Sequence, residues 1–276
     1  MPEFIDLFSH HAALYAKARP HYPPELFEYL TGLCTPRSLA WDVGTGNGQA
    51  ALGLAAHFER VIATDASAEQ LKHAAPHVRV SYHVATAEDP SLVAADGIIQ
   101  PASVDLVTIA QALHWLEFDA FYSNVRRALR PGGVIAAWCY TLPRVDARID
   151  AVLDAFYHGV TGPYWEPRRR YIDERFATIP FPFAELNPSR DRLPMTMPSM
   201  VKSEGAGSPF ACRSEWTLAE YLAYIESWSA VQKYRRERGS DPLDSIRDDL
   251  SRAWGDLAQR RLVLSPIHLR VGAVNR

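Results

Sequence analysis

The stretch Trp41-Asp42-Val43-Gly44-Thr45-Gly46-Asn47-Gly48 decides the fold of this 276-residue chain. An apolar strand runs into it, and we expect a helix from Gln49 to about His57 to follow it. Glycines at such a turn allow positive φ angles and let the backbone approach a ligand closely. The next apolar strand, 61–63, leads to Asp65, where a carboxylate suits the hydroxyls of a ribose. This order of strand, glycine turn, helix, strand and acid predicts a site for a nucleoside-containing cofactor.

The spacing of the glycines distinguishes between cofactors. A turn that binds a dinucleotide usually reads G-x-G-x-x-G, whereas this turn reads G-x-G-x-G, with Gln49 where the third glycine would fall. Asp42, just before the turn, would repel a pyrophosphate but suits a cationic ligand nearby. S-adenosylmethionine carries a sulfonium and an ammonium group, so the pattern favours that cofactor over NAD. A plain turn between a strand and a helix, without a ligand, is the alternative.

Further segments carry a family resemblance, and they are spread over nearly the whole chain: 15–23, 42–48 with Asp65, Ala87-Glu88, 105–115, 127–133 and 224–231. In these segments the chain resembles the class I S-adenosylmethionine-dependent methyltransferases. Within them it looks most similar to the branch of trans-aconitate methyltransferase and the plant embryo-abundant methyltransferase-like proteins. These branches share a frame and differ in what they methylate, so the resemblance does not identify the methyl acceptor.

The predicted cofactor site lies at the carboxyl ends of the strands, where ligands bind in an open parallel sheet. The resemblance implies that the three glycines line the methionine part, Asp65 the ribose and Ala87-Glu88 the adenine edge. The predicted cofactor residues are Tyr15, Arg19, Asp42, Gly44, Thr45, Gly46, Gly48, Asp65, Ala66, Ala87, Glu88 and Gln111. The alternatives are that Asp65 is an ordinary acid at a helix start and that Glu88 is a loop acid.

His114 and Trp115 follow the fourth expected strand, where the transferred methyl group should lie. His114 is the predicted catalytic residue, because an unperturbed imidazole titrates near pH ~6.5 and can act as a general base. A hydrogen-bonded structural histidine is the alternative. Trp115 and Trp228 are predicted to line the substrate pocket, although packing is the commoner role for a tryptophan such as Trp115. The arginine run 168–170 is expected to be a solvated surface, although one arginine could orient an acidic substrate.

Composition points to a globular enzyme without nucleic-acid or membrane partners. The 30.9-kDa chain is 47% hydrophobic, and its net charge is −3 without a basic stripe. Its first residues lack the features of a signal peptide, and no apolar run approaches the ~20 residues of a membrane span. We therefore expect a cytoplasmic monomer or homodimer. No metal is predicted, because the three cysteines are widely spaced and the histidine pairs 10–11 and 73/77 lack suitable partners.

The pattern of elements predicts an α/β fold with a Rossmann-like, doubly wound, seven-stranded and mostly parallel sheet. The resemblance places the last strand antiparallel at the sheet edge. We expect an N-terminal arm or lid over 1–36, a cofactor-binding core over 37–142, and completion of the sheet with a helical cap over 143–276. Further helices are predicted at 25–33, 67–75, 118–129, 145–159, 218–231 and 242–254, and strands at 78–84, 104–110, 134–138, 181–186 and 261–271. The arm carries Tyr15, Arg19 and Tyr22 and is expected to fold over the cofactor cleft.

The predicted function is methyl transfer from S-adenosylmethionine to a small molecule, which leaves S-adenosylhomocysteine. A carboxylate oxygen is the leading acceptor by resemblance. A carboxylate is already charged and needs no base, whereas a hydroxyl or amine acceptor would need one, and His114 is the nearest candidate. An NAD-dependent oxidoreductase is a disfavoured alternative, and a non-catalytic cofactor-binding or scaffold protein of the same fold is the other.

Overall fold

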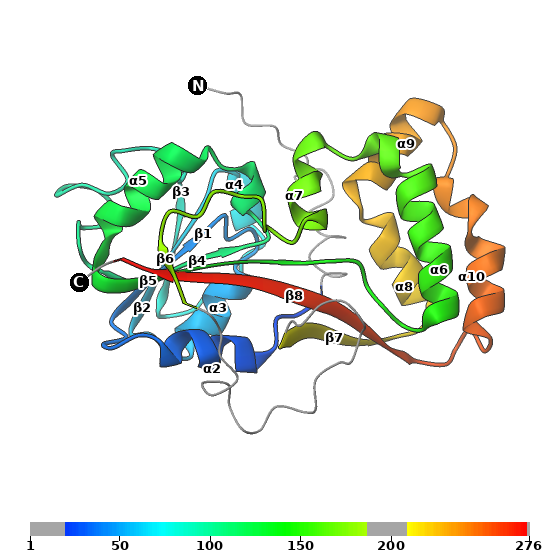
Figure 1. Ribbon diagram of the computed structural model, residues 1–276, viewed down its shortest axis with the longest axis horizontal. Coiled ribbons are helices and arrows are strands. Elements are labelled where there is room, and N and C mark those ends of the chain that lie inside the picture. Colours follow the sequence, from blue (N-terminus) through cyan, green and yellow to red (C-terminus); the bar gives the residue numbers. More distant parts are fainter. Residues whose placement is uncertain (1–19, 187–208, 275–276) are drawn as a thin grey trace.

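The computed structural model describes residues 20–186 and 209–274. Figure 1 shows a sheet covered by helices at one end of the molecule and a group of helices at the other, with the long strand β8 (Arg261–Ala273) running between them. The predicted arm residues Tyr15 and Arg19 lie outside the described residues. No helix in the described ranges is both long enough and apolar enough to span a bilayer.

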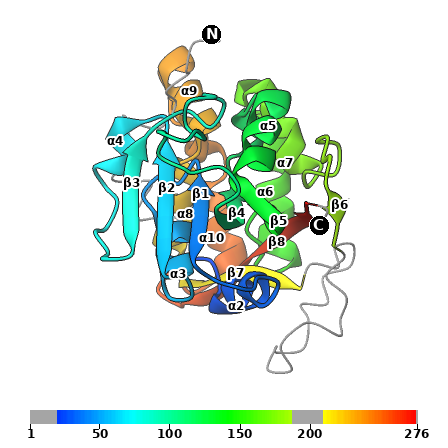
Figure 2. The ribbon, with the colours of Figure 1, turned by 90° about the vertical axis from the view of Figure 1, so that its left-hand side faces the viewer.

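The described part of the chain forms one eight-stranded sheet, in the order β3-β2-β1-β4-β5-β8-β6, with β7 also paired to β8. The five strands from β3 to β5 are parallel and stand side by side in Figure 2, and their order reverses between β1 and β4. The remaining strand bounds are β1 Leu39–Val43, β2 Arg60–Asp65, β3 Val80–Val84, β4 Val104–Ala110, β5 Leu129–Tyr140, β6 Ala184–Glu185 and β7 Phe210–Trp216. Ligands bind outside such a reversal point, which here coincides with the glycine turn after β1.

The antiparallel strand β8 lies inside the sheet. Its residues 267–273 pair with β5, its last two residues pair with β6, and residues 261–267 pair with β7. The mixed, mostly parallel sheet confirms the predicted fold class. The placement of the last strand at the sheet edge differs, because two further strands use its second side. Strand β7 was not predicted from the sequence.

Helices cover both faces of the parallel half, as the doubly wound prediction requires. Figure 1 shows α5 (Phe118–Ala128) on one side of the sheet and α2 (Pro24–Gly32) with α3 (Gln49–Ala55) on the other. Alternate residues of β1 point to opposite faces, so Trp41 packs with the α5 core and Ala40 with the α2–α3 core. The Trp41 and Phe121 ring centroids lie 6.4 Å apart. A short helix, α4 (Ala68–Leu71), follows β2 and ends earlier than predicted.

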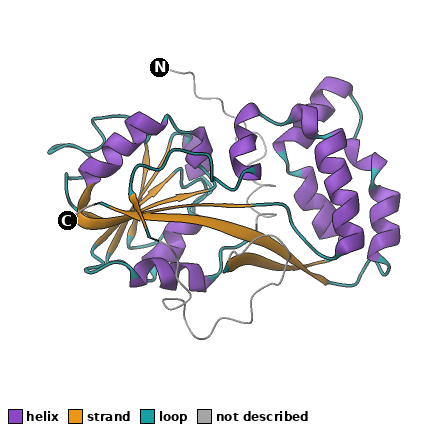
Figure 3. Cartoon of the chain, in the orientation of Figure 1, coloured by secondary structure: helices purple, strands orange, loops and turns teal. Residues whose placement is uncertain are grey.

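The other end of the molecule is a helical cap with its own apolar core (Figure 3). Its helices are α6 (Ala147–Ala155), the π-helix η3 (Phe156–Val160), α8 (Leu218–Glu226), α9 (Ser229–Arg238), η7 (Pro242–Ser245) and α10 (Arg247–Trp254). Short helices η4 (Gly162–Tyr164), η5 (Pro167–Arg169) and α7 (Arg170–Asp173) lead from the cap back to the sheet, and η2 (Leu113–Trp115) follows β4. Thr217 and Glu220 form the predicted capping box at the start of α8.

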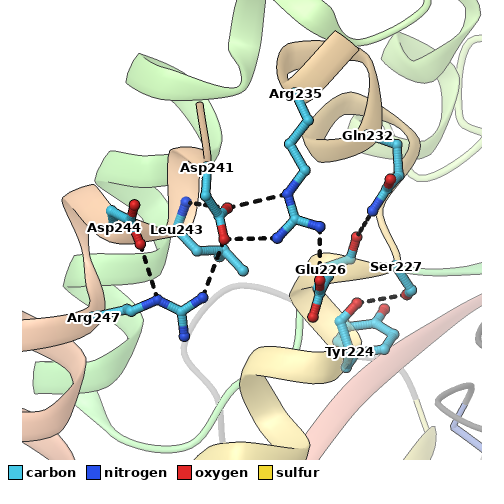
Figure 4. Close-up of polar contacts among 9 residues, drawn as sticks. All are labelled: Tyr224, Glu226, Ser227, Gln232, Arg235, Asp241, Leu243, Asp244 and Arg247. Carbon is cyan, nitrogen blue, oxygen red and sulfur yellow. Dashed lines mark hydrogen bonds and ion pairs between the residues drawn. The ribbon is translucent and has the colours of Figure 1, made fainter. Parts of the chain in front are cut away.

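The single helix predicted from Leu218 to Val231 is wrong, because α8 and α9 are separate helices. Trp228 between them is extended, with φ −67° and ψ 135°. Side chains satisfy the carbonyls that a continuing helix would have used: Ser227 Oγ donates to the Tyr224 carbonyl at 2.6 Å, and Gln232 Nε2 donates to the Glu226 carbonyl at 2.7 Å (Figure 4). The apolar stripe alone could not reveal these bonds.

Candidate functional site

The glycine turn after β1 has three residues in the left-handed region, with φ +60° at Gly44, +57° at Gly46 and +83° at Gly48. A Cβ atom at Gly44 would lie 2.6 Å from the Ala112 Cβ, and one at Gly48 would overlap the Tyr82 hydroxyl. A Cβ at Gly46 would meet nothing closer than 3.9 Å. Packing therefore demands two of the glycines, whereas the space beside Gly46 is open for a ligand.

Asp42 stabilises the turn through hydrogen bonds of its side chain. Its buried carboxylate accepts hydrogen bonds from Thr45 Oγ1 at 2.6 Å and from Thr108 Oγ1 at 2.7 Å. Burial raises the pKa of Asp42 to about 6, and the two threonine hydroxyls oppose that rise by stabilising the charged form. The structure thus places Asp42 as a link between the turn and β4. Thr108 was not predicted as part of the site, because in sequence it is only one hydroxyl within an apolar strand.

Asp65 ends β2 directly beside the turn. Its carboxylate accepts hydrogen bonds from the backbone N–H of Gly46 and of Ser67, each at 2.8 Å. A carboxylate oxygen can accept more than one hydrogen bond, so these contacts are compatible with a ribose hydroxyl at the same group. Ala66, between Asp65 and Ser67, is half-buried. The structure brings these residues together at the carboxyl edge of the sheet.

The segment after β3 is tied to α5. The carbonyl of the buried Ala87 accepts a hydrogen bond from Asn124 Nδ2 at 2.8 Å. Glu88 Oε1 accepts one from the Glu117 backbone N–H, just before α5, at 3.0 Å. Glu88 therefore has a structural contact in addition to its predicted place beside the adenine. Asn124 was not predicted, since a lone asparagine within a helical stripe carries no motif.

Gln111 turns the chain at the carboxyl end of β4. It has φ +58°, which is rare for a residue other than glycine and is typical of functional sites. Its side chain pairs with the backbone of Tyr140 at the end of β5, accepting from the N–H at 2.9 Å and donating to the carbonyl at 3.4 Å. Gln111 thereby holds two strand ends together and directs the chain toward His114.

His114 lies in η2 with its side chain almost fully buried. Its ring centroid lies 4.7 Å from that of Trp115 and 6.0 Å from that of Phe176. Arg168 Nη1 donates to the carbonyls of residues 114, 115 and 116 at 3.4, 2.9 and 3.2 Å. Arg168 Nη2 also pairs with Glu117 at 2.6 Å. The expectation of a solvated arginine run is therefore wrong for Arg168, which fixes the loop that carries His114.

The two predicted pocket tryptophans lie on different parts of the fold. Trp115 belongs to η2 after β4, whereas Trp228 separates α8 from α9 in the cap. Trp228 is buried in an aromatic cluster, with its ring centroid 5.7 Å from that of Trp165 and 5.8 Å from that of Tyr157. This aromatic cluster forms part of the apolar core of the cap.

A cavity of about 420 Å³ opens elsewhere on the cap. It is lined by Gly159, Val160, Pro163, Tyr164, Tyr234, Arg238 and Ser240. None of these seven residues belongs to the sheet, so this cavity is not at the carboxyl edge where the turn and Asp65 meet. In residues 20–186 and 209–274, no three or more His, Cys, Asp or Glu side chains are arranged to hold a metal ion.

Comparison with known proteins agrees with this geometry. Residues 41–137 match a family described as methyltransferase domain. A solved structure from Anaeromyxobacter dehalogenans, described as a "putative type II methyltransferase", is 40% identical with a TM-score of 0.78, and the match covers 93% of this chain and 98% of that one.

Two sequence relatives extend over most of the chain. A "putative methyltransferase" of Dictyostelium discoideum is 29% identical over 256 residues, which is 91% of this chain and 88% of that protein. A "probable S-adenosylmethionine-dependent methyltransferase" of Saccharomyces cerevisiae is 27% identical over 259 residues, 84% of this chain and 83% of that protein. The similarities confirm the predicted enzyme class and cofactor. The chain belongs to the class I S-adenosylmethionine-dependent methyltransferases.

Proposed function

We propose that this enzyme methylates a small molecule, with a carboxylate oxygen as the leading acceptor. The observation that carries the proposal is the aromatic cluster of the cap, Tyr157, Trp165 and Trp228, at the end of the molecule beyond the carboxyl edge of the sheet. Apolar walls with a few polar groups are typical of small-molecule sites. The net charge of −3 gives no support to a nucleic-acid acceptor. The trans-aconitate methyltransferase branch, the division into arm, core and cap, and the cytoplasmic location remain predictions.

The cofactor half is proposed to hold S-adenosylmethionine through the turn and the acid after β2. The open space at Gly46 admits the methionine part, and Asp65 binds the ribose. Ala87 and Glu88 line the adenine edge, while Tyr15 and Arg19 stay predicted contacts from the arm. When bound, the cofactor supplies an electrophilic methyl group on a positively charged sulfur. Asp42, through Thr45, holds the turn in position for it.

Methyl transfer is an in-line displacement. The part of the site that binds the acceptor must therefore align the acceptor's nucleophilic atom with the methyl group and the sulfur, and must exclude water. Gln111 and Arg168 fix the ends of the loop that presents His114 and Trp115. A carboxylate acceptor needs no proton removed, so His114 would then orient it. A hydroxyl or amine acceptor would give up its proton to His114 acting as general base.

Calorimetry with S-adenosylmethionine, S-adenosylhomocysteine and NAD tests the cofactor assignment. Both sulfur compounds should bind and NAD should not. Asp65→Ala should weaken S-adenosylhomocysteine binding by about 1–3 kcal/mol, and Asp65→Asn by less, because the amide keeps one acceptor oxygen. Unchanged affinity in Asp65→Ala would overturn the placement of the cofactor.

Turnover with His114→Ala separates the acceptor classes. Transfer of labelled methyl groups to a mixture of small acids, alcohols and amines identifies the class that reacts. With a carboxylate acceptor the variant should keep most of its kcat, whereas a hydroxyl or amine acceptor predicts a loss of about 10²–10⁴. Binding of S-adenosylhomocysteine confirms that the variant is folded. Methylation of alcohols or amines only would rule out the carboxylate proposal.

A further inference from the structure

Arg169 is largely buried, and its two neighbours in sequence, Arg168 and Arg170, make different contacts. Its side chain is 20% exposed, and its Nε donates to the Tyr157 hydroxyl at 2.9 Å. Its guanidinium carbon lies 4.6 Å from the centroid of the Trp165 ring and 5.6 Å from that of the Tyr157 ring. Arg168 is tied to carbonyls, and Arg170 lies on the surface against Tyr171. The enclosure by two aromatic faces holds the Arg169 guanidinium in one orientation.

The charge of Arg169 is only partly balanced by the protein. The nearest carboxylate, on Asp173, is 46% exposed, and its Oδ1 lies 3.8 Å from the Arg169 Nε. That oxygen also accepts the Tyr157 hydroxyl proton at 2.6 Å. Glu166, on the same turn, is paired with Lys233 at 3.1 Å. Within the described ranges, no protein acceptor bonds either terminal nitrogen of Arg169, so the fork that suits a bidentate carboxylate is available.

Arg169 lies next to the carboxyl ends of β4 and β5. The residue before it, Arg168, bonds the carbonyls of the loop after β4. Burial raises the pKa of the Cys139 thiol near the end of β5 to about 12, and the positive charge of Arg169 acts against this rise, which places that charge close to β5. Figure 1 shows α7, which begins directly after Arg169, between the sheet and the cap helices.

An aromatic residue at this site also has a hydrogen-bond donor without an acceptor. Trp165, whose face covers Arg169, has a buried Nε1–H without a hydrogen-bond partner in the described part of the chain. Buried indole N–H groups normally find an acceptor. Trp165 in turn packs on Tyr157 and Trp228, with centroid separations of 5.2 and 5.7 Å. A cation and an N–H donor thus lie together at the edge of an aromatic cluster.

We infer that Arg169 binds the carboxylate of the acceptor bidentately and that the partly exposed ring of Trp165 holds a planar body, so that the acceptor is an aromatic or conjugated acid. This inference rests on the proposed methyl transfer to a carboxylate. One carboxylate oxygen forms the new O–CH₃ bond as the C–S bond breaks, and the sulfur keeps that electron pair, so no proton moves. The ester product is neutral and loses its charge-assisted bonds to Arg169, which favours product release.

Benzoate, with benzamide as its neutral isostere and cyclohexanecarboxylate as a non-planar acid, tests the inference by calorimetry on the enzyme saturated with S-adenosylhomocysteine. Benzoate should bind at least about tenfold more tightly than either of the other two compounds. Arg169→Gln should lose about tenfold or more of the benzoate affinity, and Arg169→Lys less, because it keeps the charge without the fork. Arg170→Gln, the matched control on the surface, should stay within about twofold of wild type.

The outcomes separate this inference from the proposed function. If S-adenosylhomocysteine does not bind the wild-type enzyme, the proposed function fails. If it binds but benzoate does not, or if benzamide binds equally well, the anion site is overturned. Full benzoate affinity in Arg169→Gln would exclude Arg169 as the anchor. Equal binding of benzoate and cyclohexanecarboxylate would overturn the inference that the acceptor has a planar body.

Discussion

Two groups of backbone anchors in this enzyme use side chains of opposite charge. Carboxylates anchor the glycine turn, and arginines anchor the segments around η2 and η5. On the cofactor side, carboxylates do this: the buried Asp42 bonds Thr45 of the turn and Thr108 of β4, and Asp65 accepts from the Gly46 N–H. On the acceptor side, arginines do so: Arg168 caps the η2 loop through its carbonyls, and Arg169 stands against aromatic rings. These carboxylates bond groups within or directly after strands, so their positions are set by the sheet. The arginines connect short helices to distant segments, so their positions depend on tertiary packing.

From this contrast we expect that residues on the acceptor side can be altered without disturbing cofactor binding. Mutations that remove the anchors of each half test this separation. Stability and affinity for S-adenosylhomocysteine need to be measured in every variant, because the comparison depends on whether the two change together.

The largest effect is expected from Asp105→Ala, at the amino end of β4. The buried Asp105 carboxylate accepts from the backbone N–H groups of Ser38 and Leu39 at 2.6 and 2.9 Å and pairs with Arg130 at 2.8 Å. Its removal leaves two donors and a partly buried cation without their partner, so the free energy of unfolding should fall by about 3–5 kcal/mol. Denaturant titration measures this loss.

Asp105→Asn is the control for that change. Its amide oxygen can still accept from the backbone, so it should lose less stability than Asp105→Ala. The folded fraction of both variants should bind S-adenosylhomocysteine normally, because Asp105 lies at the end of the sheet away from the turn. A loss below about 1 kcal/mol in the alanine variant would show that carboxylates are not the main anchors of this half.

The second prediction concerns the pH dependence that Asp42 imposes. Burial raises its pKa in the folded state to about 6, above the usual ~3.9 of the unfolded chain. The folded state therefore binds the proton more readily, and the stability contributed by this group falls as pH rises from about 4 to about 6. The unfolding free energy of wild type minus that of Asp42→Asn should decrease by up to about 3 kcal/mol over this window.

Thr108→Val sharpens the test, because it removes a hydrogen bond that stabilises the charged carboxylate. The slope should then extend to higher pH than in wild type. Urea titrations at a series of pH values give both results. A difference between wild type and Asp42→Asn that does not vary with pH would mean that Asp42 titrates normally.

The same contrast explains which parts could be predicted from the sequence. The turn was predictable because positive φ angles strongly favour glycine, as at Gly44 and Gly48. The parallel strands were predictable from their apolar runs and the helices between them. Thr108 and Asn124 were missed because each acts on a segment at least 35 residues away in sequence. Arg168 was misjudged because charge runs are usually solvated, and only the fold brings it to the carbonyls after β4.

The cap shows the same limit at the level of secondary structure. A periodic apolar stripe predicted one helix where α8 and α9 are separate, because the stripe reports which face is buried and not where side chains intercept the backbone. Strand β7 was missed because its pairing partner, β8, lies some fifty residues further along the chain, beyond the reach of local pattern. Residue pattern therefore specifies the cofactor half well and the acceptor half poorly.

The third prediction compares glycines of the turn. Both Gly44→Ala and Gly46→Ala place a Cβ on a left-handed residue, which costs about 1–2 kcal/mol of stability. Gly44→Ala should cost about 1–3 kcal/mol more, because its Cβ would lie 2.6 Å from Ala112. The Cβ in Gly46→Ala meets no atom closer than 3.9 Å but fills the predicted ligand space, so the variant should lose about tenfold or more in S-adenosylhomocysteine affinity.

Gly32→Ala is the matched control for the glycine pair. A Cβ there has nothing within 4 Å, and its backbone is helical, so a gain of up to about 1 kcal/mol with unchanged affinity is expected. Thermal unfolding and calorimetry give the two quantities. If Gly46→Ala kept the affinity of Gly32→Ala, the open space at the turn would not be the cofactor site.

The smallest effect is expected in the cap, at the ion-pair network of Figure 4. Arg235 bridges Glu226 at the end of α8 and Asp241 before η7, each at 2.7 Å, and Arg247 shares Asp241. Because Arg235 is 28% exposed and belongs to a network, Arg235→Gln should cost about 1 kcal/mol and less at high salt. Arg252→Gln, whose pair with Asp249 is isolated and exposed, should cost at most a few tenths. Hydrogen exchange in Arg235→Gln should accelerate from 217 to 254 and stay unchanged from 39 to 65, with full S-adenosylhomocysteine affinity. Acceleration in both ranges, or a parallel loss of affinity, would show that the two halves open as one unit and would break the separation on which the comparison rests.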